Sequence, residues 1–256
     1  MNQNLCKNCA NTFEGNFCSN CGQKTNTKRL DWNYIYDEAK YTFLHLNNGL
    51  FYTTKELLTR PGDMVREFIE GKRVKHYKPI LLVFVLAGIS TILAHYNGDL
   101  LFLEKMNDPN QKKLFGPKGL SNIFSEYYTL MQVISVPLIS VCTWLAFKKW
   151  GYNFIENIII NSFATAQLLI IGIIFTPVKF LCANTGFALL SSSLIGFGSY
   201  GFNIWLYLKL YKGQDLGFII LRLLLALFYF GLLFIIITIG FTFFLLLTNS
   251  NLIKPA

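Results

Sequence analysis

The chain has few charged residues, and acidic residues are the scarcest of these. Only 14% of its 256 residues are charged, with 14 acidic against 23 basic side chains and a formal net charge of +9. Hydrophobic residues make up 53%, aromatic residues make up 16%, and the mean hydropathy is +0.40. A soluble globular domain carries more charge than this. The composition therefore argues against a soluble protein and indicates an integral membrane protein.

The sequence also lacks the recognised patterns of catalytic residues. It has no HExxH, no GxSxG, no phosphate-binding glycine loop and no carboxylate pair within an apolar segment. Arg60, Glu67 and Arg73 are the one set of ionisable groups that can converge on the cytoplasmic side, and ion pairing explains them better than catalysis does. We therefore expect no enzymatic activity.

The N-terminal residues do not show the pattern of a secretory signal peptide either, and none is expected. The first thirty residues are polar and contain four cysteines where a signal peptide has an apolar core. We therefore expect this N-terminal head to stay in the cytoplasm.

The four cysteines form two CxxC pairs separated by eight residues: Cys6 and Cys9, then Cys18 and Cys21. This spacing supplies the four thiolates that structural Zn²⁺ binds tetrahedrally. Gly22 suits the tight turn after the second pair, because glycine tolerates a positive φ. Two disulfides would need an oxidising compartment, and a redox dithiol would need a βαβ setting that is missing. We predict a zinc ribbon in residues 1–28, with a structural ion on which its fold depends.

Residues 29–79 show helical spacing of apolar side chains without any run of membrane-spanning length. Asn47-Asn48-Gly49 and Arg60-Pro61-Gly62 interrupt this spacing. We predict short amphipathic helices that lie in the membrane interface, with aromatic side chains at headgroup depth. A small soluble domain folded around the ribbon fits the same spacing, because amphipathic periodicity does not distinguish the two.

A basic hinge, Arg60 to Pro79, leads into the first long apolar segment. It holds six basic against three acidic residues, and the next charge after it is Asp99. Such a cluster marks the cytoplasmic side, and anionic lipid attracts it by about 1 kcal/mol per basic side chain. The hinge is either a topology signal alone or a site for a lipid or ligand headgroup. The candidate headgroup ligands are Arg60, Arg66, Lys72, Arg73, Lys75, Tyr77 and Lys78.

The remaining chain, residues 80–256, is expected to form a transmembrane bundle. We predict an all-α polytopic membrane protein with about five spans, at residues 80–96, 127–147, 156–181, 187–211 and 216–248. The hinge, Lys148–Lys149 and Lys209–Lys212 would then lie inside, and the neutral loop at 97–126 and the C-terminus outside. The last segment is longer than one crossing requires, so it tilts, begins in the interface or breaks at Gly231.

Polar groups inside the predicted spans are few. Glu156, Lys179 and Arg222 lie near span ends, where their side chains can reach the interface. Neutral polar residues within the spans are expected to form hydrogen bonds between helices. These residues are Gln132, Asn161, Gln167 and Asn203.

Four motifs in the first eighty residues carry a family resemblance: a CxxC…FCxxCGQ ribbon, Thr-x-x-Glu-Leu, Arg-Pro-Gly, and Gly-Lys-Arg-x-x-x-Tyr. Their positions here are Cys6, Cys9, Cys18, Cys21, Gly22, Gln23, Thr53, Glu56, Leu57, Arg60, Pro61, Gly62, Gly71, Lys72, Arg73 and Tyr77. On these motifs the chain resembles the bacterial membrane family known only as the domain of unknown function numbered 3667. The resemblance implies an inner-membrane location and brings no established activity.

We therefore expect a non-catalytic inner-membrane protein that binds lipids or a partner, with the zinc ribbon as a cytoplasmic docking head. Anionic membrane lipid is the expected ligand, and a cytoplasmic protein or a second copy of the chain is a further candidate partner. Nucleic acid is not expected, because the basic residues flank apolar segments instead of forming one face. The alternative is a transporter or channel through the bundle, in which Pro137 and Pro177 permit helix breaks.

Overall fold

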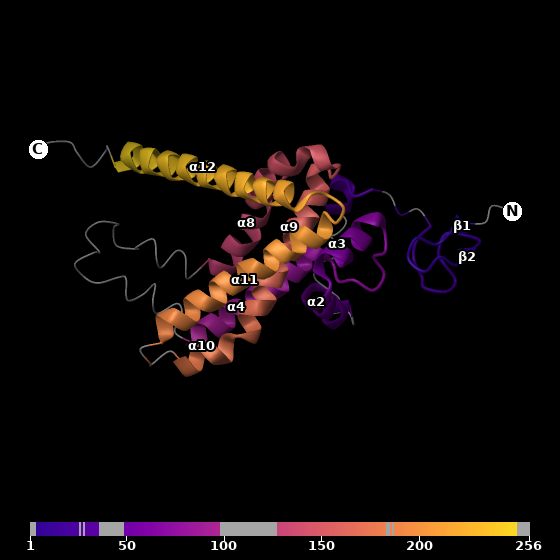
Figure 1. Cartoon of the computed structure of the whole chain (residues 1–256), viewed down its shortest axis with the longest axis horizontal. Helices are drawn as coiled ribbons and strands as arrows, with labels where there is room; N and C mark the ends of the chain where they lie inside the picture. Colours follow the sequence, from indigo (N-terminus) through magenta and orange to yellow (C-terminus); the bar gives the residue numbers. More distant parts are fainter. Residues whose placement is uncertain are drawn as a thin grey trace, which may run out of the picture.

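The computed structural model describes residues 4–25, 27, 29–35, 49–97, 127–182, 185 and 187–249. This part of the chain is mostly helical, with one small sheet near the N-terminus (Figure 1). The predominance of helices predicted from the sequence is thus confirmed. The predicted neutral loop, apart from its first residue, and the predicted outside C-terminus lie beyond the described residues.

The N-terminal ribbon contains two short antiparallel strands, β1 (Asn4–Leu5) and β2 (Thr12–Phe13). Asn4 pairs with Phe13 and Leu5 pairs with Thr12. Phe13 is buried against the cysteines in a core of its own, separate from that of the helices. The ribbon lies beside the helical body rather than within it (Figure 1). A core this small is consistent with a fold that depends on a bound ion.

Two short helices follow, α2 (Gly49–Thr59) and α3 (Pro61–Glu70). Proline lies in the first turn of α3. It suits a helix start, because N–H groups in the first turn have no acceptor within the helix and proline lacks this group. Their apolar faces, which include Leu57, Met64 and Phe68, are buried in the same core as the long helices. These faces are thus covered by protein, and the position of the two helices in the membrane interface stays a prediction.

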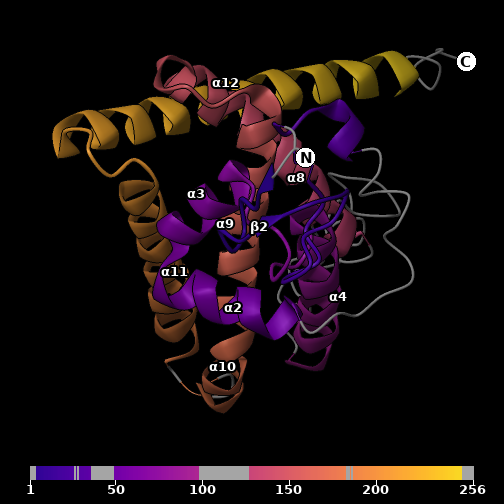
Figure 2. The same ribbon diagram turned by 90° about the vertical axis from the view of Figure 1, so that its right-hand side faces the viewer.

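Four longer helices form the body: α4 (Pro79–Asn97), α8 (Tyr128–Phe147), α9 (Phe154–Ile174) and α11 (Ala188–Leu210). A short 3₁₀ turn, η1 (Lys148–Trp150), joins α8 to α9. Helix α9 is central, since it contacts α2, α3, α4, α8 and α11 (Figure 2). Its side chains are buried almost without interruption from Ile155 to Ile171.

The predicted third span is divided into two helices. Helix α9 ends at Ile174, and α10 (Thr176–Cys182) begins after Phe175. Pro177 explains the break, because proline has no N–H to continue the hydrogen-bond ladder of α9. The fourth and second predicted spans correspond to α11 and α8, and α8 runs through Pro137 without ending.

Three helices in the described part of the chain are long and apolar enough to cross a membrane. They cover Thr129–Trp150, Phe154–Ile174 and Leu216–Gly240. The apolar part of α4, Pro79–Ala94, is shorter, and α11 contains many serines and glycines that lower its hydropathy. These three candidate spans indicate a membrane protein. The predicted count of about five spans is not confirmed.

The last helix, α12 (Leu216–Asn249), is continuous, so the predicted alternative of a break at Gly231 is wrong. It lies across the end of the body where α9 begins and α11 ends (Figure 2). Ile219 and Ala226 are its buried apolar contacts, and Arg222 donates a hydrogen bond to the carbonyl of Ala146 at 2.6 Å. Most of the rest of α12 is exposed.

Candidate functional site: a four-cysteine centre docked on a basic hinge

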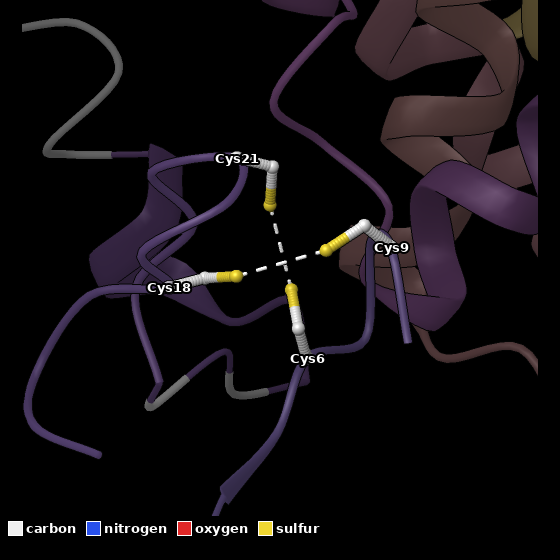
Figure 3. A group of neighbouring side chains, drawn as sticks. All are labelled: Cys6, Cys9, Cys18 and Cys21. Atoms are coloured by element: carbon white, nitrogen blue, oxygen red, sulfur yellow. Dashed lines mark hydrogen bonds between the residues drawn. The ribbon is translucent and has the colours of Figure 1, made fainter. Parts of the chain in front are cut away.

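The four cysteine side chains of the ribbon point toward one centre (Figure 3). The sulfur atoms of Cys6 and Cys21 lie 3.5 Å apart, those of Cys9 and Cys18 lie 3.6 Å apart, and all four are within 4.8 Å of one another. Four sulfurs around Zn²⁺ at about 2.3 Å are separated by about 3.8 Å, whereas a disulfide needs about 2.05 Å. The group is therefore arranged to bind a metal, and all four cysteines are free thiols.

The backbone forms this centre by using the same turn twice. The N–H of Ala10 donates to the carbonyl of Cys6, and the N–H of Gly22 donates to the carbonyl of Cys18, both at 2.8 Å. Both donors have a positive φ, +57° for Ala10 and +73° for Gly22. The positive φ predicted for Gly22 is confirmed. Alanine carries no comparable sequence signal, so the matching turn after Cys9 was not foreseen.

The two ends of the centre differ in exposure. Cys6 and Cys18 are buried, whereas Cys9 and Cys21 are partly exposed. Burial raises the pKa of the Cys6 thiol to about 11. A backbone hydrogen bond from Gln23 lowers the pKa of Cys21. A divalent cation binds thiolates, so metal binding would displace the Cys6 proton despite this burial.

The ribbon docks on the C-terminal end of α3 through Gly71. The side-chain amide of Gln23 donates to the Gly71 carbonyl and to the Thr27 hydroxyl, and Lys7 donates to the Thr27 carbonyl at 2.8 Å. Gly71 has a φ of +119°, and a Cβ there would lie 3.1 Å from the Lys7 side chain and 3.3 Å from that of Thr27. Glycine is required both by the turn that ends α3 and by the close approach of the ribbon.

A cleft of about 510 Å³ remains between the ribbon and the hinge. The ribbon wall contains one residue from inside each CxxC pair together with the partly exposed cysteines. The opposite wall comes from α2 and from the hinge, which includes α3. The lining residues are Asn8, Cys9, Asn20, Cys21, Tyr52, Glu67, Lys72, Lys75 and His76. The metal centre and two lysines of the hinge therefore face the same space.

His76 contributes little positive charge to this cleft at neutral pH. Its ring packs between those of Tyr52 and Phe68, with centroid distances of 5.2 and 6.0 Å. Burial lowers the pKa of His76 below its ordinary value, although Glu56 and Glu67 act in the opposite direction. The lysines are therefore the main positive groups that line the cleft.

The three arginines proposed as headgroup ligands make contacts within the protein. Arg60 pairs with Glu56 and with Glu67, the latter at 3.1 Å, which agrees with the expected ion-pair role. Arg66 donates to the carbonyls of Lys209 and Leu210, both at 2.6 Å, and so joins α3 to the end of α11.

The third arginine, Arg73, closes the end of α3. It donates to the carbonyls of Phe68 and Ile69 at 3.1 and 3.4 Å, and its guanidinium lies 5.4 Å from the ring centroid of Tyr34. Tyr77 is buried, and its N–H donates to the Thr53 hydroxyl at 2.7 Å.

The lysines of the hinge are less enclosed. Lys75 is exposed and Lys78 is partly exposed. Lys72 lies 3.7 Å from the Glu67 carboxylate with 43% of its side chain exposed. Of the predicted headgroup ligands, Lys72 and Lys75 are thus the two that line the cleft.

An ion pair that the sequence analysis missed anchors the linker after the ribbon. Arg29 donates to both carboxylate oxygens of Glu156, at 2.7 and 2.8 Å, and to the Gly151 carbonyl at 2.9 Å. Glu156 is 3% exposed. The prediction that its side chain reaches out to the membrane interface is therefore wrong. Glu156 also forms a capping box with Asn153 at the start of α9. The spacing Asn-x-x-Glu before an apolar run was the available signal.

Hydrogen bonds between helices were predicted at Gln132, Asn161, Gln167 and Asn203, and the last three residues form them. Asn161 accepts from the Tyr207 hydroxyl at 2.9 Å. Gln167 donates to the Leu57 carbonyl at 2.9 Å, and Asn203 donates to the Ala164 carbonyl at 3.1 Å. Gln167 thus connects α9 to α2.

Residues 47–91 match the family model described as protein of unknown function (DUF3667). The matched region covers α2, α3, the hinge and most of α4, and it confirms the resemblance to that family there. The cysteine ribbon precedes the matched residues. No curated protein and no solved structure matches the chain.

Proposed function

We propose that this protein is a non-catalytic protein of the bacterial inner membrane that binds anionic lipid at its cytoplasmic surface, with a zinc ribbon as its docking head. The observation that carries the proposal is the cleft between ribbon and hinge, into which Lys72 and Lys75 project from the hinge wall. Amino groups at a membrane surface attract anionic headgroups by about 1 kcal/mol each.

The orientation is supported by where the basic segments meet. Arg66 of the hinge binds the carbonyls at the end of α11, next to Lys209. Trp150, which follows Lys148–Lys149, packs its ring on Tyr211 with centroids 5.0 Å apart. Three basic segments therefore gather at one end of the body, as expected for the cytoplasmic side.

Zinc is the proposed ion because the donor set is entirely cysteine. Four thiolates in tetrahedral arrangement suit Zn²⁺, and they leave no ligand position for water or substrate. The ion would then be structural, and its role would be to hold the ribbon folded. Purified protein is expected to contain about one Zn²⁺ per chain.

The experiment is a calorimetric titration of detergent-purified protein with short-chain phosphatidylglycerol, which measures the affinity for the lipid. Replacing Lys72 and Lys75 together by alanine should weaken binding about 10- to 30-fold, since two attractive groups are lost. The matched control is the double alanine variant of Lys24 and Lys55, which are exposed and lie outside the cleft. Equal weakening in both variants, or in neither, would refute a specific role for the cleft.

Arg73 is a poor choice for this experiment, although the hinge composition makes it an obvious candidate. Its guanidinium satisfies two carbonyls at the end of α3 and packs over two aromatic rings. Replacing it would disturb the fold of the hinge and lipid binding together.

No observation specifically favours the transporter alternative. The polar side chains that would line a path through the body, such as Asn161 and Gln167, are buried and bonded to neighbouring helices. The described cleft lies beside the ribbon rather than inside the body.

A further inference from the structure

The charge of the metal centre changes how the cleft must be understood. Four thiolates around one divalent ion carry a net charge of about −2. Cys9 and Cys21, one from each pair, line the cleft directly. A loaded ribbon therefore presents a negative wall to the hinge, and an anionic lipid entering the cleft would meet this wall as well as the lysines.

The opposite wall is positively charged. Glu67 also lines the cleft, but Arg60 pairs with it at 3.1 Å and Lys72 approaches it at 3.7 Å. Arg60 also pairs with Glu56, so these ion pairs offset one another, and Glu67, Lys72 and Lys75 leave a net charge of about +1 facing the centre. The ribbon and the lipid thus have the same attractive partners.

We infer that the metal-loaded ribbon is an autoinhibitory cap, whose thiolate centre competes with anionic lipid for Lys72 and Lys75. This inference rests on the proposed lipid-binding function of the same cleft. The docked ribbon holds the lysines, and anionic lipid binds when the ribbon moves away from the hinge. The neutral contact between Gln23 and Gly71 sets the docked position, and the charges set how firmly that position is held.

Docking can be measured without lipid. Dyes on noncanonical amino acids at Glu14 of the ribbon and Lys149 of the body, both exposed, report ribbon position by energy transfer in the metal-loaded full chain. Replacing Lys72 and Lys75 by glutamine should lower the transfer efficiency and weaken metal retention against a chelator about two- to fivefold per lysine. The matched glutamine variant of Lys24 and Lys55 should behave as the parent does.

The charge of the centre can be changed while the metal is kept. Cys9→His converts four thiolates into three thiolates and an imidazole, a set that also binds Zn²⁺, and reduces the net charge to about −1. This variant should lower energy transfer and raise the affinity for phosphatidylglycerol. Its effect on transfer should be much smaller in a chain already lacking Lys72 and Lys75, because the two changes remove one interaction. Cys21→His serves if Cys9→His fails to retain about one ion per chain.

The outcomes separate this inference from the function it builds on. Additive effects of Cys9→His and the lysine variant on energy transfer, or no effect of either with the metal retained, would overturn the cap. Insensitivity of energy transfer to added salt would also overturn it, because 1 M salt shortens the screening length to about 3 Å. Failure of the lipid titration alone would remove the proposed ligand, while coupled docking effects would still establish the contact between centre and hinge.

Discussion

At the scale of single residues, Gly62 sets how closely α3 approaches α11. A Cβ at this position would lie 2.3 Å from the backbone nitrogen of Leu210 and 2.5 Å from the carbonyl carbon of Lys209. Backbone atoms cannot turn aside as the end of a flexible side chain can. The adjoining Arg66 then reaches the carbonyls of the same two residues. The Arg-Pro-Gly motif is therefore a contact between helices as well as a helix start.

Gly62→Ala is expected to destabilise the protein by about 1–3 kcal/mol, because overpacking against backbone forces the helices apart. The measurement is the thermal unfolding midpoint in detergent. Gly88→Ala in α4 is the control, since a Cβ there meets nothing within 4 Å and alanine is the better helix former. If Gly62→Ala were as stable as the parent, the close approach of α3 to α11 would be wrong.

At the scale of elements, α9 is held by polar contacts as well as by its apolar surface. Tyr207 of α11 donates to Asn161, which in turn donates to the Thr143 hydroxyl of α8 at 2.8 Å. All three side chains are buried. A single polar cluster therefore fixes the positions of α8, α9 and α11 relative to one another. Hydrogen bonds of this kind specify register where apolar packing alone would tolerate sliding.

Tyr207→Phe should destabilise the protein by about 1 kcal/mol, because it leaves the Asn161 carbonyl oxygen without its donor. Tyr200→Phe is the matched control in the same helix, since Tyr200 is 63% exposed. Thermal unfolding of the two variants in one detergent gives the comparison. Equal stability of both variants would mean that the cluster does not hold the helices together.

Element by element, the sequence was most informative where a residue type has few other uses. Two CxxC pairs predicted the metal centre, and the apolar segments predicted the long helices. The burial of α2 and α3 was not predictable, because a short amphipathic face looks the same whether lipid or protein covers it. The bond between Arg29 and Glu156 was equally hidden, since its two residues are 127 positions apart and only folding brings them together.

At the scale of the whole molecule, the two ends of the body differ in the residues that form them. The hinge, Lys148–Lys149 and Lys209–Lys212 gather where α12 begins. The opposite end includes Thr129, whose hydroxyl bonds that of Thr91 at 2.6 Å, and the turn at Thr185. Three basic segments gathered at one end of the body are the arrangement expected of a cytoplasmic face.

Cysteine labelling in intact cells tests this asymmetry. In a background with Cys182→Ala, Lys149→Cys should resist a membrane-impermeant maleimide until the cells are opened, whereas Thr185→Cys should react at once. Both positions are exposed, so the difference reports the side of the membrane and not burial. Labelling of Lys149→Cys from outside would reverse the proposed orientation.

Helix α12 joins the rest of the protein through its first turns, at Ile219, Arg222 and Ala226. Its later side chains are open, with Leu227 72% and Ile236 66% exposed. At 1.5 Å per residue the helix is about 50 Å long, while a spanning helix tilts by about 0–40° from the bilayer normal. Helix α12 instead lies across the body in Figure 2. The open apolar surface of α12 beyond Ala226 is therefore left for lipid to cover.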